Sequence, residues 1–511
     1  MHKFLKATMI VTIFAVATRA LGFCLRIFLS RKMGAETLGS YQIAMSVFGV
    51  LMTIIASGIP LIVSRNVAYF EGKDKASQNR NITAGLIVAG TISIVICGVF
   101  FALGGLFQKV LSADSVNMIY ILLPTLVVSS VYAILRGGMW GRKYFFTISF
   151  TEFFEQVVRI ILVAILFALP IGLSNGQKSA LSLTLSAVAS SLLVVVLYFV
   201  YGGKLLPAKT EIKNIIVAST PITMVRTVSS VIGSIIAIIL PARLMMYGYS
   251  NGEALAIFGM YMGMVLPLIM VPSTFISSIA VALVPELSGF TNNISKATED
   301  SKLQLKNRIN KALSLTIAIS FVLMPAFWAV GEPICKVLFD NAEAGKYLVM
   351  SAILMLPMGV NQICSSMLNA IGLEKRELLH YVVGAMSLVV CVILLPKYIG
   401  GYAIFAGLLS MNMISSVLSI ITLKQKDLIN FSFLKTIAFC LIIVLFASLI
   451  AKFTFGICDR FCGLFLSTAI SGFICEVVAV LLMFVFDLFS IKVLLIKYKK
   501  KNKKVQQKTI A

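Results

Sequence analysis

The chain has 511 residues, of which 59% are hydrophobic and only 13% are charged. Soluble proteins carry about 45–50% apolar and about 25% charged residues, so this composition excludes an ordinary soluble enzyme, a disordered chain and a secreted disulfide scaffold. The net charge of +24 is explained by basic cytoplasmic loops, and we expect no nucleic-acid partner. With two histidines and nine cysteines, most of them in apolar runs, we expect neither a metal site nor a cofactor.

Apolar runs long enough to cross a bilayer recur along the whole chain, and each crossing needs about 20 residues. They predict an all-α polytopic membrane protein with about fourteen transmembrane helices. The segment from Glu286 to Arg308 is expected to be the longest loop, so no soluble catalytic domain fits. The predicted spans are about 5–29, 41–62, 82–107, 117–135, 147–169, 180–203, 214–240, 255–285, 309–330, 347–370, 377–395, 401–423, 434–451 and 463–489.

The basic residues are distributed unequally between alternate loops. If both termini are cytoplasmic, the inner segments carry 30 Lys and Arg residues and the outer loops carry 10. Basic residues favour the cytoplasmic side, so we expect a multi-pass protein of the cytoplasmic membrane with both ends inside. The run KYKKKNKK at residues 497–504 is expected to contact anionic membrane lipids.

A weak internal repeat relates the two halves of the chain. The segment PTLVVSSVYAILRGGMWGRK, which starts at Pro124, aligns with PMGVNQICSSMLNAIGLEKR, which starts at Pro357. Six spans separate the two segments, so the repeats are parallel, as in many transporters. We therefore predict four regions: a six-helix lobe at 1–203, a second at 204–430, two additional helices at 431–489 and a basic cytoplasmic tail at 490–511.

Four arginines lie inside predicted spans, where a charge is costly. Arg19, Arg159 and Arg226 are each about 12 residues, or roughly 18 Å, into their spans. Arg26 follows Arg19 on nearly the same helix face. Because no acid shares a helix with Arg19, Arg26 or Arg226, we predict that these three line a water-filled cavity and bind an anion such as a diphosphate; the alternative is structural pairing with acids.

The intramembrane acids gather in the span 147–169, which contains FTEFFEQVVRIIL. Glu155 and Arg159 are four residues apart and are expected to form an intrahelical ion pair. Glu152 would then remain for proton or cation coupling, and Glu476 is a further acid that faces either the cavity or the lipid. Prolines interrupt other spans, as hinges for alternating access or as static kinks: Pro221, Pro267 and Pro272.

Several stretches resemble stage V sporulation protein B and related polysaccharide-biosynthesis membrane proteins. They are TRALGFCLRIFLSRKMGAETLGSYQ, ASGIPLIVSRNVA, EQVVR, GLEKRELLHYVVG and LLPKYIGGYAIFAGLLS. This group belongs to the multidrug/oligosaccharidyl-lipid/polysaccharide exporter superfamily, which includes lipid II flippases. The resemblance implies two six-helix lobes around a V-shaped central cavity, two extra helices, and Arg19, Arg26 and Arg226 as cavity cations. SVIGSIIAIILPARL lacks an acid associated with this position in the group, so that acid's coupling role does not transfer.

The expected function is therefore that of a monomeric flippase and not of an enzyme. The resemblance implies that it moves a polyprenyl-diphosphate-linked glycan, such as a peptidoglycan precursor for the cell wall or spore cortex, by alternating access. The alternative is a cation-coupled multidrug exporter of the same superfamily, which four intramembrane arginines against three acids disfavour. A membrane enzyme would need catalytic groups in a sizeable outer loop, and a scaffold would leave the embedded arginines unexplained.

Overall fold

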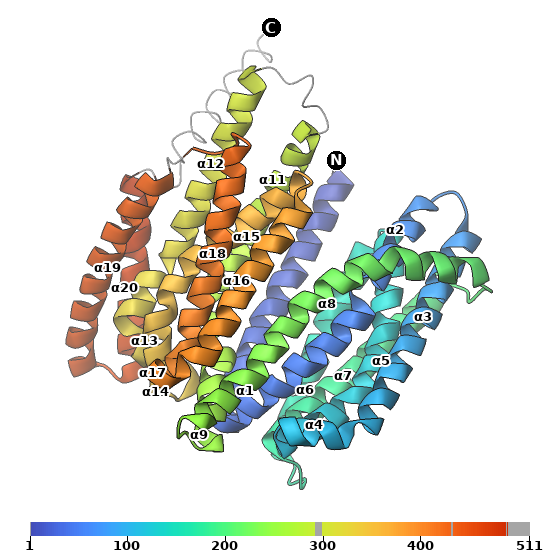
Figure 1. Ribbon diagram of the computed structural model, residues 1–511, viewed down its shortest axis with the longest axis horizontal. Helices are drawn as coiled ribbons and strands as arrows, with labels where there is room; N and C mark the ends of the chain where they lie inside the picture. Colours follow the sequence, from blue (N-terminus) through green and yellow to red (C-terminus); the bar gives the residue numbers. More distant parts are fainter. Residues whose placement is uncertain (1, 292–298, 431–432, 487, 489–511) are drawn as a thin grey trace. The chain divides into compact units, whose positions relative to one another are not determined.

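The computed structural model describes residues 2–291, 299–430, 433–486 and 488. These residues form helices joined by short turns, and they contain no strand (Figure 1). The chain divides into two compact units, Met1–Gly263 (unit 1) and Met264–Ala511 (unit 2). The basic run 497–504 lies outside the described residues.

Unit 1 is built from nine described α-helices, and a six-residue π-helix, η1 (Met260–Val265), leads out of it. The α-helices are α1 (His2–Ala56), α2 (Ile59–Tyr69), α3 (Lys75–Ala102), α4 (Gly104–Val110), α5 (Ala113–Gly141), α6 (Phe145–Ala168), α7 (Asn175–Val200), α8 (Lys209–Met246) and α9 (Asn251–Gly259).

The first of these, α1, is two helical segments joined at Gly34. This glycine has a φ of 73° and a ψ of 171°, a conformation that glycine adopts at little cost. The chain turns back at this point (Figure 1). A straight helix of 55 residues would be about 80 Å long, far more than the roughly 30 Å of a hydrocarbon core. The two segments therefore correspond to the predicted spans 5–29 and 41–62.

Unit 2 contains the remaining helices, of which η3 (Ala352–Leu354) and η4 (Gly400–Tyr402) are short 3₁₀ turns. The α-helices are α10 (Leu266–Ile269), α11 (Val271–Thr291), α12 (Glu299–Val322), α13 (Met324–Phe339), α14 (Ala342–Ser351), α15 (Met355–Ala370), α16 (Glu374–Leu394), α17 (Pro396–Ile399), α18 (Ala403–Gln425), α19 (Phe433–Phe461) and α20 (Leu464–Val485).

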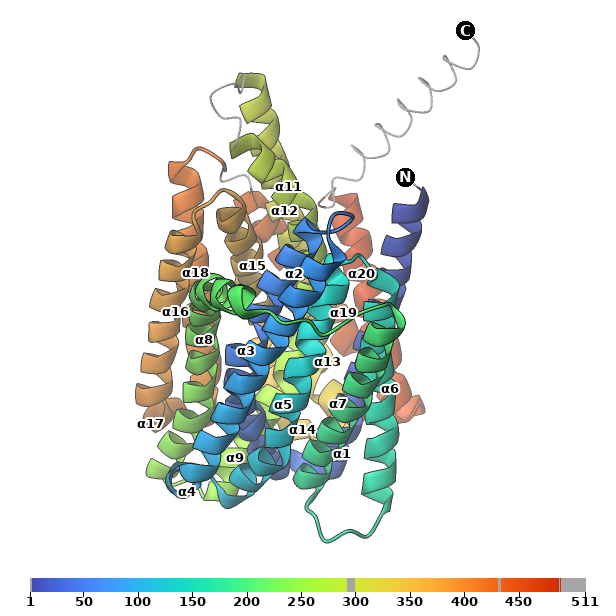
Figure 2. The same ribbon diagram turned by 90° about the vertical axis from the view of Figure 1, so that its right-hand side faces the viewer.

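The same packing scheme occurs in both units. In unit 1, α5 packs against α2, α3 and α7, and α7 also packs against α6. In unit 2, α15 packs against α11, α12 and α18, and α18 also packs against α16. Figure 2 shows the α6–α7 and α16–α18 pairs, each running side by side. Since α5 contains Pro124 and α15 contains Pro357, the repeat found in the sequence is also a repeat in packing.

Twelve described helical stretches are long and apolar enough to cross a membrane, against fourteen predicted spans. One difference is that Val11–Tyr69 forms a single stretch, although it contains the turn at Gly34. The other is α6, which is long enough but carries three charged residues. The chain is a multi-pass membrane protein, and the count of fourteen remains a prediction.

The structure differs from the predicted boundaries in two places. Unit 1 extends beyond residue 203 because α8 packs on α1, α2 and α3, and α9 packs on α1 and α8. The two additional helices, α19 and α20, lie within the predicted range 431–489 and pack on α12 and α13 of unit 2. The expected loop from Glu286 to Arg308 is partly helical, because α11 ends only at Thr291 and α12 already begins at Glu299. Hydropathy finds the apolar part of a helix and misses a polar extension.

The predicted prolines lie in two different settings. Pro267 and Pro272 lie where the short helices η1 and α10 are followed by the 21-residue α11, as expected when proline removes a backbone donor. Pro221 lies inside α8, which Figure 1 shows as a bent helix. Both arrangements contain irregular helix geometry, and the hinge role of these prolines remains a prediction.

Candidate functional site

Charged and phenolic side chains of α1 and α6 meet where these two helices pack against each other. The Arg159 Nη2 on α6 donates a hydrogen bond of 3.1 Å to the Tyr41 hydroxyl on the second segment of α1. Arg26, on the first segment, is close enough to interact electrostatically with both residues. The turn at Gly34 brings the two segments of α1 together, so that Arg26 and Tyr41 can share one neighbour.

A second charged contact joins α5 to α6. The Arg136 Nη2 forms a salt bridge with the Glu152 carboxylate, and each side chain is 35% exposed. Glu152 is therefore paired with Arg136 and is not the spare carboxylate that the sequence predicts. Arg136 was missed because the apolar run ends at residue 135 and the arginine was counted in a loop. It lies within α5, which continues to Gly141.

Glu155 and Arg159 do not form the expected ion pair among the described residues. Arg159 instead donates to Tyr41. Glu155 interacts electrostatically with Arg159 without a salt bridge, and it also lies near the hydroxyl of Ser190 on α7. A contact with a neighbouring helix has replaced the intrahelical contact. The four-residue spacing permits an ion pair, but the Arg159 side chain is directed to Tyr41 on the neighbouring α1.

Several buried donors around these residues lack an acceptor in the described structure. They include the Nε atoms of Arg136 and Arg159, the Nε2 of Gln156 and the hydroxyl of Tyr132. An unmet buried donor costs about 1–3 kcal/mol, so native proteins rarely retain one without a purpose or a bound water. The α1–α5–α6 region, which we call the arginine cluster (Arg26, Tyr41, Arg136, Glu152 and Arg159), therefore has donors to offer to a ligand or to water.

Arg226 occupies a different place from the arginine cluster. Its Nη1 donates to the Ser57 carbonyl at 3.3 Å, in the two-residue break between α1 and α2. The hollow that it lines, about 430 Å³ in volume, is bounded by residues of α1 and α8. Ser57 is sixteen residues after Tyr41 in the chain, or about 24 Å along a helix. The structure therefore spreads the arginines along the helices and does not place Arg226 at the depth of Arg159.

Arg19 and Glu476 lie outside the arginine cluster. Arg19, like Arg26, is exposed on the first segment of α1. Glu476 belongs to unit 2, where neither of its buried carboxylate oxygens has a hydrogen-bond partner among the described residues. The described residues contain no group of three or more His, Cys, Asp or Glu that could hold a metal ion, and Cys458 and Cys462 are free thiols.

Comparisons with known proteins agree on the type of fold. Residues 4–290 match the family described as "Polysaccharide biosynthesis protein". Stage V sporulation protein B of Bacillus subtilis (strain 168) is 24% identical over 400 residues, which cover 75% of this chain and 76% of that protein.

Two solved structures share the fold. The inward closed conformation of the lipid II flippase MurJ has a TM-score of 0.71 at 14% identity, over 94% of this chain and 99% of that one. An inward-facing multidrug resistance transporter of the MATE family and MOP superfamily has a TM-score of 0.67 at 16% identity, over 80% of this chain and 94% of that one. These identities are low, so the likeness concerns the fold.

Proposed function

Because the chain belongs to the polysaccharide biosynthesis protein family, we propose that it is a flippase that moves a polyprenyl-diphosphate-linked glycan across the cytoplasmic membrane. The observation that carries the proposal is the gathering of Arg26 and Arg159 beside Tyr41, among buried donors that lack acceptors. A diphosphate is recognised best by charge-assisted hydrogen bonds from planar guanidinium groups.

The separation of the arginines along α1 is compatible with a substrate that moves through the membrane. Arg26 and Arg159 lie near Tyr41, whereas Arg226 lies about 24 Å farther along α1, measured by the helical rise. A diphosphate head group that passes from one end of unit 1 to the other would exchange guanidinium partners on the way. No single arginine then has to hold it through the whole passage, and each contact need only be moderately strong.

The glycan is proposed to be a peptidoglycan precursor, for the cell wall or the spore cortex. This part rests on the names of two similar proteins, a stage V sporulation protein and a lipid II flippase.

The charge distribution of the loops supports cytoplasmic termini. Cysteines placed at the exposed Tyr69 and Tyr398 test this orientation, since Tyr398→Cys should react with an impermeant reagent from outside and Tyr69→Cys should not.

A cation-coupled multidrug exporter is the second candidate function. It is favoured by the fold of the MATE transporter and by Glu155, which has no ion pair among the described residues. The pairing of Glu152 with Arg136 disfavours it, because this pairing leaves fewer carboxylates for a cationic drug.

Reconstitution in liposomes tests the flippase proposal. A fluorescent polyprenyl-diphosphate-linked sugar should become accessible to a membrane-impermeant quencher faster in the presence of the protein. Arg26→Ala and Arg226→Ala should each slow this by about tenfold or more, since a charge-assisted hydrogen bond contributes about 1.5–3 kcal/mol, while Arg26→Lys should keep part of the rate.

The matched control is Arg80→Ala, which removes an exposed arginine at the start of α3. Its rate should equal that of the wild type. If both alanine variants flip the lipid at the wild-type rate at equal reconstitution, the arginines do not bind the diphosphate. If the protein instead exports an organic cation and the rate depends on Glu155, the exporter function replaces the flippase.

A further inference from the structure

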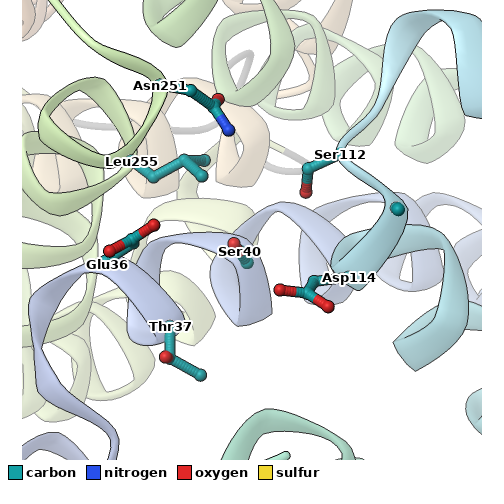
Figure 3. Close-up of a pocket in the computed structure, with 8 residues that line it drawn as sticks. Glu36, Thr37, Ser40, Ser112, Asp114, Asn251 and Leu255 are labelled. Atoms are coloured by element: carbon teal, nitrogen blue, oxygen red, sulfur yellow. The ribbon is translucent and has the colours of Figure 1, made fainter.

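A hollow of about 260 Å³ opens at the end of unit 1 where α1 turns back (Figure 3). Its polar wall comes from three separate parts of the chain. Glu36 and Ser40 follow the turn at Gly34, Asp114 lies in the first turn of α5, and Asn251 is the first residue of α9. None of its lining residues belongs to the arginine cluster, although Ser40 directly precedes Tyr41 in the chain.

The local structure holds these oxygen atoms in place. Ser112 caps α5 and lies 2.8 Å from the hydroxyl of Ser115, which donates to the Ser40 carbonyl at 3.0 Å. The Ser112 hydroxyl also accepts from the Ser115 amide at 3.3 Å, so Ser112 and Ser115 are committed to joining α5 to α1. On the other side, the Glu36 carboxylate lies against Gly252, where a β-carbon would be only 3.1 Å from its Oε1.

The groups that face the hollow are not used by the fold. Glu36 and Asp114 are exposed and form no ion pair among the described residues. Ser40 is only 3% exposed, yet its hydroxyl makes no hydrogen bond within the described part of the chain, although its carbonyl accepts from Ser115. A nearby acid shows the contrast, since Glu253 accepts from Ser250 at 2.8 and 2.9 Å in a helix cap.

We propose that this hollow binds a hard divalent cation, Ca²⁺ or Mg²⁺, through Glu36, Asp114, Ser40 and Asn251. All four supply oxygen atoms, the donors that these ions prefer, and the two carboxylates match a charge of +2. Figure 3 shows Ser40 between Glu36 and Asp114, while the side chain of Thr37 turns away. The volume of about 260 Å³ leaves room for water to complete the coordination shell.

Binding of the ion should connect three helices that are far apart in the sequence. The ion would tie the second segment of α1 to the beginnings of α5 and α9. Since both acids are exposed, the dissociation constant should be on the order of 0.1–1 mM, as in open calcium modules. A cation that binds only the folded protein raises the thermal midpoint with concentration, which gives a readout that does not depend on transport.

The test is isothermal titration of the purified full chain with CaCl₂ and with MgCl₂, together with thermal unfolding at the same concentrations. NaCl of equal ionic strength serves as the reference. We expect saturable binding of at least one of the two ions and a rise in Tm. Glu36→Gln combined with Asp114→Asn should weaken the affinity at least about tenfold, which corresponds to 1.4 kcal/mol, and should abolish the rise in Tm. Glu343→Gln, an exposed acid in the first turn of α14, should behave as the wild type.

Two results would overturn the proposal. One is the absence of saturable binding of either ion to the wild type; the other is equal affinity in the wild type and the double variant. If the double variant does not fold, Ser40→Ala tests the site instead, because it removes one neutral ligand and leaves both carboxylates. It should then bind the ion more weakly than the Glu343→Gln control, and equal binding would count against the site.

Discussion

In unit 1, α6 brings charged side chains to its neighbours, through the Arg159–Tyr41 hydrogen bond and the Glu152–Arg136 salt bridge. In unit 2, α16 holds the equivalent place in the packing scheme and brings His380, whose ring nitrogens lie 3.1 Å from the Ser419 hydroxyl and 3.4 Å from the Thr422 hydroxyl. The two helices have the same kind of neighbours but different chemistry.

The helices α5 and α15 show the same contrast. The former carries Arg136 in its salt bridge, whereas the latter carries Gln362, whose Nε2 donates to the Ser277 hydroxyl at 2.7 Å and to the Ser273 carbonyl at 3.2 Å. Neutral groups that satisfy one another can be buried cheaply, while charges in a membrane are costly. In this pair of helices, unit 1 carries an ion pair where unit 2 carries neutral hydrogen-bonding groups; that the charges of unit 1 serve binding is a prediction.

The largest expected effect on stability is that of Arg136→Ala. This change leaves the half-buried Glu152 without its partner, so the free energy of unfolding should fall by about 1.5–3 kcal/mol. The double variant Arg136→Gln with Glu152→Gln should recover part of the loss, because no charge is stranded. Thermal unfolding of the purified proteins measures both.

Lys336→Ala is the matched control for the salt bridge. It removes the exposed Lys336–Asp340 pair of unit 2, whose side chains are 48% and 71% exposed, and an exposed pair contributes only about 0–1 kcal/mol. An Arg136→Ala variant that is no less stable than Lys336→Ala would show that the charges of unit 1 are ordinary surface charges.

An intermediate effect is expected for Gln362→Leu. The change removes two neutral hydrogen bonds in unit 2 and should cost about 1–2 kcal/mol of stability. Lipid flipping per folded molecule should remain close to that of the wild type, because Gln362 serves packing. If flipping falls as much as in Arg26→Ala at equal protein level, unit 2 also binds the substrate. That result would contradict the assignment of binding to unit 1 alone.

The smallest effect is expected for Glu476→Gln. The change keeps the shape of the side chain, and neither carboxylate oxygen has a partner to lose among the described residues. The free energy of unfolding should not fall, because a neutral amide costs less to bury than an unpartnered carboxylate, and flipping should be unaffected. A clear loss of flipping at normal stability would make Glu476 a coupling residue.

The sequence by itself determined the class of the protein. Apolar runs along the whole chain predicted an all-α membrane protein, and the match between the segments at Pro124 and Pro357 predicted the repeat that the packing of α5 and α15 displays. These features are local, or repeat at fixed intervals, because a span needs only its own residues to be apolar.

The tertiary structure alone decided which charges meet. Tyr41 and Arg159 are 118 residues apart in the chain, and no spacing within one helix could indicate their hydrogen bond. Arg136 lies just beyond an apolar run and was assigned to a loop, yet α5 continues through it and presents it to Glu152. Hydropathy reports how each segment partitions between water and lipid, whereas the partner of a buried charge depends on how helices pack against one another. For this reason Arg159 contacts Tyr41 of a neighbouring helix and does not form the predicted salt bridge with Glu155. For the same reason Arg226 contacts the Ser57 carbonyl and does not lie at the depth of Arg159.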